Sequence, residues 1–237
     1  MMQIIQSKDL NEILSSNEIQ LFKKLQNIIS NINKNTNLTR LVEGDDYWIS
    51  QVYDSIWPFY LNQRKIFDSK KFIDIGSGCG FPGLAYAITH PNSEVYLVDS
   101  SRKKTDALKQ IIEELNFSNK IFVINDRIEN IAHNASYRNN FDIGTSRAVG
   151  SPSTVAEYIL PMLNRNGIGL LYCGKWKKED EVKIMNSLRI LKGSIAEITQ
   201  TILPKQKGER NIIFIKPDQN CPDSYPRGIG KPAKYPL

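Results

Sequence analysis

A glycine-rich loop carries the clearest chemistry in the sequence. Residues 74–83 read Asp-Ile-Gly-Ser-Gly-Cys-Gly-Phe-Pro-Gly, and they begin within a short, mainly apolar stretch, residues 72–75, that predicts a buried strand. Glycines let the backbone turn tightly and approach a ligand where a side chain would clash. Asp99, nineteen residues beyond Gly80, stands at the end of the next predicted strand, residues 95–98. A carboxylate there accepts hydrogen bonds from both hydroxyls of an adenosine ribose, so the spacing predicts a nucleoside cofactor.

The spacing of the loop also bears on which nucleoside it binds. Loops that bind dinucleotides usually read G-x-G-x-x-G and hold a pyrophosphate at a helix N-terminus. Here Gly80 comes one residue early, and Asp74 stands two residues before Gly76. A carboxylate would repel a pyrophosphate and attract an ammonium group. The arrangement resembles class I S-adenosylmethionine methyltransferases, in which this acid faces the amino-acid end of the cofactor. We therefore expect S-adenosylmethionine, with a nicotinamide-dependent oxidoreductase as the enzymatic alternative.

The elements around the loop alternate between strands and helices. The strands are predicted at residues 72–75, 95–98, 121–124, 141–145 and 168–172, and the helices at 84–89, 102–115 and 155–163. Such βαβ units predict an α/β fold, a Rossmann-like and mostly parallel sheet covered on both faces. Two further β-rich runs, residues 195–203 and 211–215, flank a polar turn around Lys207-Gly208. They predict an antiparallel hairpin at the edge of the sheet.

The first part of the chain has the periodicity of helices. Ser16 is the expected N-cap of a helix whose apolar stripe ends at Ile32, and asparagines from Asn31 to Asn37 predict a loop. A second helix is expected over residues 45–57, with Pro58 marking its end. We predict three units: an N-terminal helical extension at 1–65, a methyltransferase-type domain at 66–217, and a basic Pro/Gly-rich tail at 218–237.

The excess of positive over negative charge lies in the last third of the chain. Residues 164–237 hold 14 Lys and Arg against 7 Asp and Glu, whereas the rest holds 17 against 18, and the net charge is +6. This distribution fits either an anionic partner such as nucleic acid or a solvated surface. No apolar run reaches the roughly 20 residues of a membrane span, and no signal-peptide pattern begins the chain. Three scattered cysteines and two histidines predict a cytoplasmic protein without a disulfide framework or metal site. A monomer is the default expectation.

Several further motifs, together with the loop, resemble one family. They are Asn37-Leu38-Thr39, Asp54-Ser55, Arg127-Ile128-Glu129, Ser146-Arg147-Ala148, Glu209-Arg210 and the tail from Tyr225-Pro226-Arg227 to Pro236-Leu237. The sequence is similar over nearly its whole length to the small-subunit ribosomal RNA methyltransferase G family, once called glucose-inhibited division protein B. Tyr53 and Trp176 depart from the family pattern, which often has His and Gly there.

The resemblance implies an activity and a set of site residues. The activity is methylation of guanine N7 in the 530 loop of 16S ribosomal RNA, near the decoding site, with S-adenosylmethionine as donor. The implied cofactor residues are Asp74, Gly76, Gly78, Phe81, Asp99, Ser100, Ser101, Ile128, Glu129 and Arg147. Arg147 is expected to orient the cofactor carboxylate or an RNA phosphate, and Arg127, Lys175 and Arg210 are candidates for phosphate contacts.

The expected chemistry needs no general base. Guanine N7 carries a free lone pair at neutral pH, so a direct displacement requires only that N7, the methyl carbon and the sulfur be aligned. A non-catalytic RNA-binding or ribosome-assembly protein that keeps the same fold is the second alternative, although such a protein would not need the intact loop and Asp99.

Overall fold

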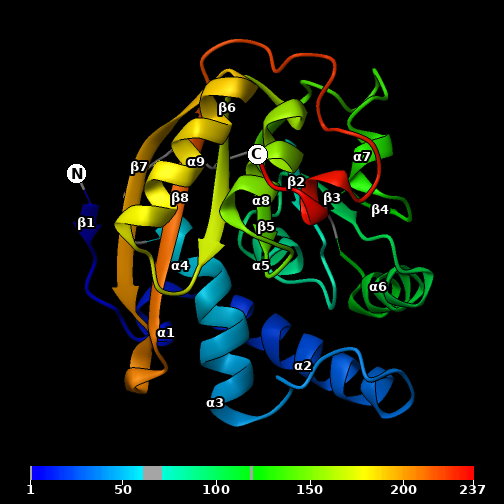
Figure 1. Ribbon diagram of the computed structural model, residues 1–237. Helices are drawn as coiled ribbons and strands as arrows, with labels where there is room; N and C mark the ends of the chain where they lie inside the picture. Colours follow the sequence, from blue (N-terminus) through cyan, green and yellow to red (C-terminus); the bar gives the residue numbers. More distant parts are fainter. Residues whose placement is uncertain (1, 61–70, 118–119) are drawn as a thin grey trace.

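The computed structural model describes residues 2–60, 71–117 and 120–237, which form one mixed sheet with helices on both faces (Figure 1). The eight strands of this part of the chain lie in the order β1-β7-β8-β6-β5-β2-β3-β4. Their bounds are β1 Met2–Ile4, β2 Lys71–Ile75, β3 Glu94–Val98, β4 Ile121–Ile124, β5 Phe141–Arg147, β6 Leu163–Cys173, β7 Gly193–Ile202 and β8 Glu209–Pro217.

The sheet is parallel except at one strand. β8 runs antiparallel to both of its neighbours, β6 and β7, and the other pairs are parallel. This confirms the predicted α/β fold with an antiparallel hairpin. The hairpin does not form the edge of the sheet as predicted, because β1 pairs with β7 and lies beyond it. The strand order reverses at β2, which has β3 on one side and β5 on the other. Ligands of open α/β sheets bind at the carboxyl ends of the strands beside such a switch point.

Helices cover the two faces of the sheet with separate apolar clusters. The helical segments are α1 Leu10–Ile13, α2 Ser16–Thr36, α3 Gly44–Tyr47, the π-helix η1 Trp48–Tyr53, α4 Asp54–Tyr60, α5 Gly83–Thr89, α6 Arg102–Leu115, α7 Ile128–Ile131, α8 Pro152–Ile159, η3 Leu160–Met162, α9 Lys178–Leu191, η4 Pro204–Gln206 and α10 Lys231–Lys234. On one face, α2, α4, α5 and α6 pack around Phe72 and Ile143 of the sheet. On the other, α8 and α9, in front of the sheet in Figure 1, pack on Ile73 and Leu171. Neighbouring strand residues thus serve opposite cores, which is why these strands read as continuous apolar runs.

The sequence predicts a helical N-terminal segment, but the structure begins with a short strand. β1 pairs in parallel with β7, with Ile4 opposite Gln200, and three residues are too few to show a strand period. Helix α2 is capped by Ser15, not Ser16: the Ser15 hydroxyl accepts from the Glu18 N–H, and the Glu18 carboxylate accepts from the Ser15 N–H. This is a capping box.

Asn31, Asn33 and Asn35 lie inside α2, which ends at Thr36, and Asn37 is its C-cap, with a left-handed φ of 49°. Burial of Ile32 continues the apolar stripe, and this packing outweighs the weak helix propensity of asparagine. The predicted loop therefore begins about one and a half turns too early.

The second predicted helix is three joined segments, α3, η1 and α4. Pro58 lies within α4 and does not end the helix, because the helical chain continues to Tyr60. Trp57 and Phe59 on either side are buried in the core, and their packing compensates for the hydrogen bond that proline cannot donate. The π-helical turn of η1 is a feature that often accompanies functional sites.

Three other differences concern the second half of the chain. Helix α9 was not predicted, although its buried residues Ile184, Leu188 and Leu191 recur at one-turn spacing. Leu163 begins β6, although the sequence predicts the end of a helix there, and the strand therefore starts before its predicted position at residue 168. The predicted boundary between the N-terminal helical extension and the methyltransferase-type domain, between residues 65 and 66, lies outside the described residues. None of the described helices is both long and apolar enough to cross a membrane.

Candidate cofactor and substrate site

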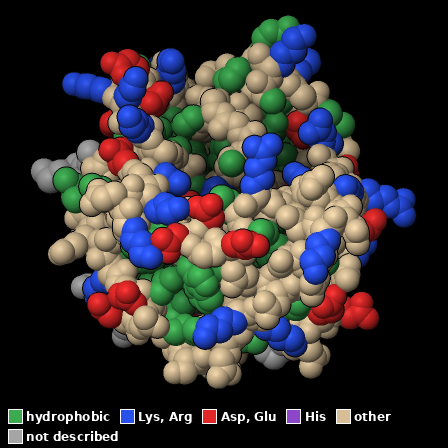
Figure 2. All heavy atoms as spheres, turned by 90° about the horizontal axis from the view of Figure 1, so that it is seen from below, with side chains coloured by type: hydrophobic (Ala, Val, Ile, Leu, Met, Phe, Trp, Pro, Cys, Tyr) green, Lys and Arg blue, Asp and Glu red, His purple; other side chains and the backbone are tan. Residues whose placement is uncertain are grey.

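Two hollows meet at the carboxyl ends of β2 and β5. The larger, which we call the arginine cavity, has a volume of about 610 Å³ and is lined by Gln51, Asp54, Phe81, Arg147 and Arg210 among others. The smaller, the aspartate cavity, has a volume of about 280 Å³ and is lined by Asp99, Ser100, Asp126, Ile128 and Glu129 among others. Gly76, Lys104 and Ala148 line both. Figure 2, seen from below Figure 1, shows this hollowed face with Lys and Arg side chains around it and acidic ones between them.

The glycine loop has the backbone that its sequence predicts. Gly76, Gly78 and Gly80 have φ values of +74°, +57° and +101°, a region that favours glycine. A Cβ on Gly76 would lie 2.3 Å from Val149 Cγ2, and one on Gly80 would lie 2.3 Å from Leu84 Cδ1. The loop therefore needs glycine both for its turn and for the close approach of its neighbours.

Asp99 joins the loop to the aspartate cavity. Its side chain is 7% exposed; Oδ2 accepts from the Gly78 N–H at 3.0 Å and Oδ1 from the Ser101 N–H at 2.9 Å. The Lys104 ammonium lies 3.8 Å from Oδ2. Ser100 lines the cavity, whereas Ser101 contributes its backbone N–H and stands at the N-cap position of α6. The carboxylate is thus fixed in orientation at the wall of the cavity.

Asp74 lies beneath the loop and lines neither cavity. Its carboxylate is 1% exposed, with Oδ2 accepting from the Gly83 N–H at 3.1 Å and Oδ1 from the Thr145 hydroxyl at 3.0 Å. Burial raises the pKa of Asp74 to about 6, although these hydrogen bonds and the charge of Arg147 oppose the shift. In this geometry Asp74 ties the loop to β5. Its contact with a cofactor ammonium stays a prediction.

The N-terminal helices hold the arginines of the arginine cavity. Arg147, the last residue of β5, donates from Nη1 to the Ser50 carbonyl at 3.0 Å and to Asp54 Oδ2 at 3.2 Å, and from Nη2 to Gln51 Oε1. Arg210 Nε lies 3.2 Å from Asp54 Oδ1. Asp54 therefore bridges two arginines that are far apart in the sequence. Sequence reasoning did not assign Gln51, Asp54 or Lys104 to the site, although the Asp54-Ser55 motif was a signal.

The other predicted residues divide between the cavities. Phe81 is 3% exposed, lines the arginine cavity and meets Tyr47 edge-on, so it serves as both wall and core. Arg127 is exposed at the aspartate cavity, and Lys175 is exposed beyond the end of β6 and lines neither cavity. The four candidate cations therefore do not form one cluster. Tyr53 and Trp176, which depart from the family pattern, also lie outside both cavities.

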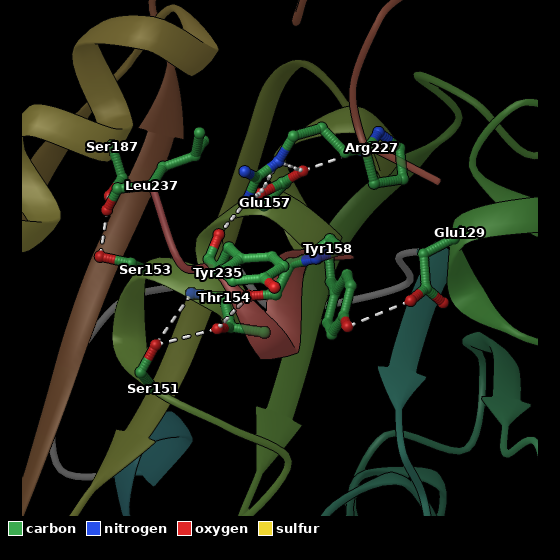
Figure 3. Close-up of polar contacts among 12 residues, drawn as sticks. Glu129, Ser151, Ser153, Thr154, Glu157, Tyr158, Ser187, Arg227, Tyr235 and Leu237 are labelled. Carbon is green, nitrogen blue, oxygen red and sulfur yellow. Dashed lines mark hydrogen bonds and ion pairs between the residues drawn. The ribbon is translucent and has the colours of Figure 1, made fainter. Parts of the chain in front are cut away.

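Glu129 has partners that the sequence did not suggest. It is 3% exposed, and Oε1 accepts from the Tyr158 hydroxyl at 3.2 Å and from the Gly230 N–H of the tail at 3.0 Å. Burial and the charge of Glu129 raise the pKa of Tyr158, so its hydroxyl stays protonated and donates (Figure 3). Among the described residues, no group of three or more His, Cys, Asp or Glu is placed to hold a metal ion.

Solved structures with low sequence identity share this fold. Cofactor-bound Rv0187 from MTB has a TM-score of 0.56 at 12% identity and covers 87% of this chain and 99% of its own. A mutant of MtNAS has a TM-score of 0.52 at 14% identity and covers 86% and 71%. At such identities the likeness concerns the fold alone.

Sequence relatives are much closer. A protein of Prochlorococcus marinus strain MIT 9515 named ribosomal RNA small subunit methyltransferase G is 64% identical over 97% of this chain and 96% of its own length. One of the same name from strain NATL1A is 44% identical over 94% and 90%. The family model described as GidB, rRNA small subunit methyltransferase G, matches residues 18–213. The chain therefore belongs to the rRNA small subunit methyltransferase G family, as its motifs indicated.

Proposed function

We propose that this protein transfers a methyl group from S-adenosylmethionine to 16S ribosomal RNA of the small subunit, at guanine N7 in the 530 loop. The observation that carries the proposal is the junction of the two cavities at Gly76: one has the fixed acid expected for a ribose, and the other has arginines. The names of the sequence relatives support the RNA substrate.

The aspartate cavity suits the nucleoside half of the cofactor. Asp99 faces it with a carboxylate whose orientation is fixed, as hydrogen bonding to two ribose hydroxyls requires. Ile75, Val98 and Ile128 provide apolar walls for a purine, with Glu129 at its edge. The amino-acid end would extend past Gly76, where a side chain on the loop would obstruct it. The larger volume, about 610 Å³, lies within the range of small-molecule sites, and the smaller, about 280 Å³, lies just below it.

The residues of the site would act by alignment. Bound S-adenosylmethionine supplies a methyl group activated by its sulfonium. Because guanine N7 already has a free lone pair, no side chain needs to remove a proton. Asp74, whose pKa is raised to about 6, has both oxygens engaged beneath the loop, so it is not placed to act as a base. Holding the reacting atoms in line and excluding water can supply much of the acceleration.

Arginines beside the methyl position suit an RNA substrate. Arg147 and Arg210 line the larger cavity, and Lys175 is exposed beyond the end of β6, at the same edge of the sheet. Such cations would neutralise phosphates and orient the RNA backbone, whereas the base must enter the cavity to reach the methyl group. Arg147 would orient either the cofactor carboxylate or a phosphate through its guanidinium.

The test is methyl transfer from labelled S-adenosylmethionine to small-subunit RNA that lacks the modification. Naked 16S RNA, 30S particles and assembly intermediates should be compared, and the labelled base should be mapped. We expect label at N7 of one guanine in the 530 loop and none with an Asp99→Ala variant. Label at another base would correct the target. Binding of labelled S-adenosylmethionine without transfer to any RNA would favour a non-catalytic role, and binding of NAD instead would favour an oxidoreductase.

A further inference from the structure

The C-terminal tail, residues 218–237, is fastened to the domain at several points along its length. Arg138 donates from its guanidinium to the carbonyls of Cys221, Pro222 and Tyr225 at 2.8–3.0 Å. Further on, the Thr154 hydroxyl donates to the Pro232 carbonyl and the Ser187 hydroxyl to that of Leu237 (Figure 3). In Figure 1 the tail, in red, runs over the top of the molecule and returns to end beside α8. It is therefore an integral part of the fold and not a projecting basic arm.

An ion pair with a buried carboxylate fixes the middle of the tail. Glu157 of α8 has a fully buried carboxylate: its Oε1 accepts from the backbone N–H and Nε of Arg227 at 2.8 and 3.0 Å, and Oε2 accepts from Nη2 at 2.8 Å. Nη2 also donates to the Tyr235 carbonyl at 2.7 Å, which closes residues 227–235 into a loop. The charge of Arg227 is thus paired with the buried carboxylate of Glu157, although 27% of the Arg227 side chain is exposed.

This closed loop reaches the aspartate cavity. Gly230, with a φ of +76° that favours glycine, directs its N–H to Glu129 Oε1 at 3.0 Å. Both described donors to Glu129, Gly230 and Tyr158, reach the same oxygen. Three residues further on, Ala233 lines the cavity itself. The tail thus supplies both a wall of the cavity and a hydrogen bond that holds one of its acids.

We infer that the C-terminal tail is part of the cofactor site, in which Arg227 and Glu157 are positioning residues that hold Gly230 and Ala233 against the aspartate cavity. The inference rests on the proposed function, because it takes the ligand of that cavity to be S-adenosylmethionine. Without the tail, Glu129 loses one of its two donors and the cavity opens to water at Ala233. The cofactor should then bind more weakly, while RNA contacts at the arginine cavity remain.

The experiment compares cofactor and RNA affinities in the full chain and three variants. Truncation after Arg227 keeps the ion pair but removes Gly230 and Ala233, and Arg227→Gln removes the charged partner of Glu157. Lys231→Ala is the matched control, because Lys231 is an exposed cation of the same segment. Calorimetry with S-adenosylhomocysteine should show a Kd at least tenfold higher for the first two variants and unchanged for Lys231→Ala. The Kd for naked 16S RNA should change less than twofold in all three.

Hydrogen exchange on the unaltered chain gives a second measurement, which does not require that any of the variants folds. Adding S-adenosylhomocysteine should slow exchange of the amides of residues 227–235, and adding RNA alone should not. Unchanged cofactor affinity after truncation, or no slowing in the tail, would overturn the inference. Intact cofactor affinity with weaker RNA binding in the truncation and in Lys231→Ala would assign the tail to RNA. An unaltered chain that binds no S-adenosylhomocysteine would defeat the proposed function itself.

Discussion

Asp54 Oδ2 lies 3.2 Å from Arg147 Nη1, and this contact joins the N-terminal helices to the end of β5 at the wall of the arginine cavity. The two side chains are only 6% and 15% exposed. Asp54 also contacts Arg210, so one carboxylate serves two cations. The N-terminal segment is therefore part of the site, and its helices set the direction of the arginines.

The Asp54–Arg147 pair should show strong energetic coupling. Asp54→Asn and Arg147→Gln should each lower the free energy of unfolding by about 1–3 kcal/mol. The first leaves the mostly buried Arg147 without its carboxylate, and the second leaves the buried Asp54 with Arg210 as its one charged partner among the described residues. The double variant should lose less than the sum, with a coupling of about 1 kcal/mol or more. Urea denaturation of the four proteins measures this.

The exposed pair Lys205–Asp45, with Nζ 2.7 Å from Oδ1, is the control for this comparison of single and double variants. Its side chains are 67% and 43% exposed, so its coupling should stay below about 1 kcal/mol. Additive losses at Asp54 and Arg147 would show that the contact between them contributes nothing to stability.

Asp74 should make stability depend on pH in the opposite sense to a typical carboxylate. Its pKa is raised to about 6 in the folded protein, against 3.8 for the ordinary group, so the folded state binds the proton more tightly. The unaltered protein should therefore gain stability relative to Asp74→Asn as the pH falls from about 7 to 4. A pKa difference of about two corresponds to roughly 3 kcal/mol. Urea midpoints of both proteins at several pH values test this, and a constant difference would contradict it.

Gly83 should tolerate no side chain, for reasons of packing alone. A Cβ there would lie 2.2 Å from Leu97 Cδ2 and 3.0 Å from Asp74 Oδ2. Gly83→Ala should lower the free energy of unfolding by about 1–3 kcal/mol, because buried neighbours must move and the bond to Asp74 is strained. Gly174→Ala is the control, since nothing lies within 4 Å of a Cβ there, and its effect should stay within about 0.5 kcal/mol. Equal denaturation curves for the two variants would refute the packing argument.

Lys175 should contribute to RNA binding through charge. It is exposed and follows β6 at the carboxyl edge of the sheet. Lys175→Ala should weaken binding to 16S RNA and reduce the slope of log K against log salt by about one, because one fewer counterion is released. Lys216→Ala is the control, since this lysine is also exposed. It lies near the end of β8 that is farther from Lys175, because β8 runs antiparallel to β6. An unchanged slope for Lys175→Ala would exclude a phosphate contact.

The sequence determined the central sheet and the glycine loop because both follow from local patterns. Apolar runs, turn residues and the step from Gly80 to Asp99 are readable along the chain, and they located the loop, its acid and the two strands of the hairpin. They did not show that β1 covers the outer side of that hairpin. The errors fell where packing overrides local preference, as at the asparagines of α2 and at Pro58. The sequence did not predict β1, because three residues at the edge of a sheet are too few to show the alternation of a strand.

Tertiary structure alone decided which residues meet. Asp54 and Arg147 lie on segments more than ninety residues apart, and nothing local to either motif indicates the pair. The tail, which composition suggested as a basic surface, instead neutralises Arg227 with the buried Glu157 and closes against the aspartate cavity. A charge count records how many cations the last third contains, but only the fold decides which of them remain exposed, because burial without a partner would cost too much free energy.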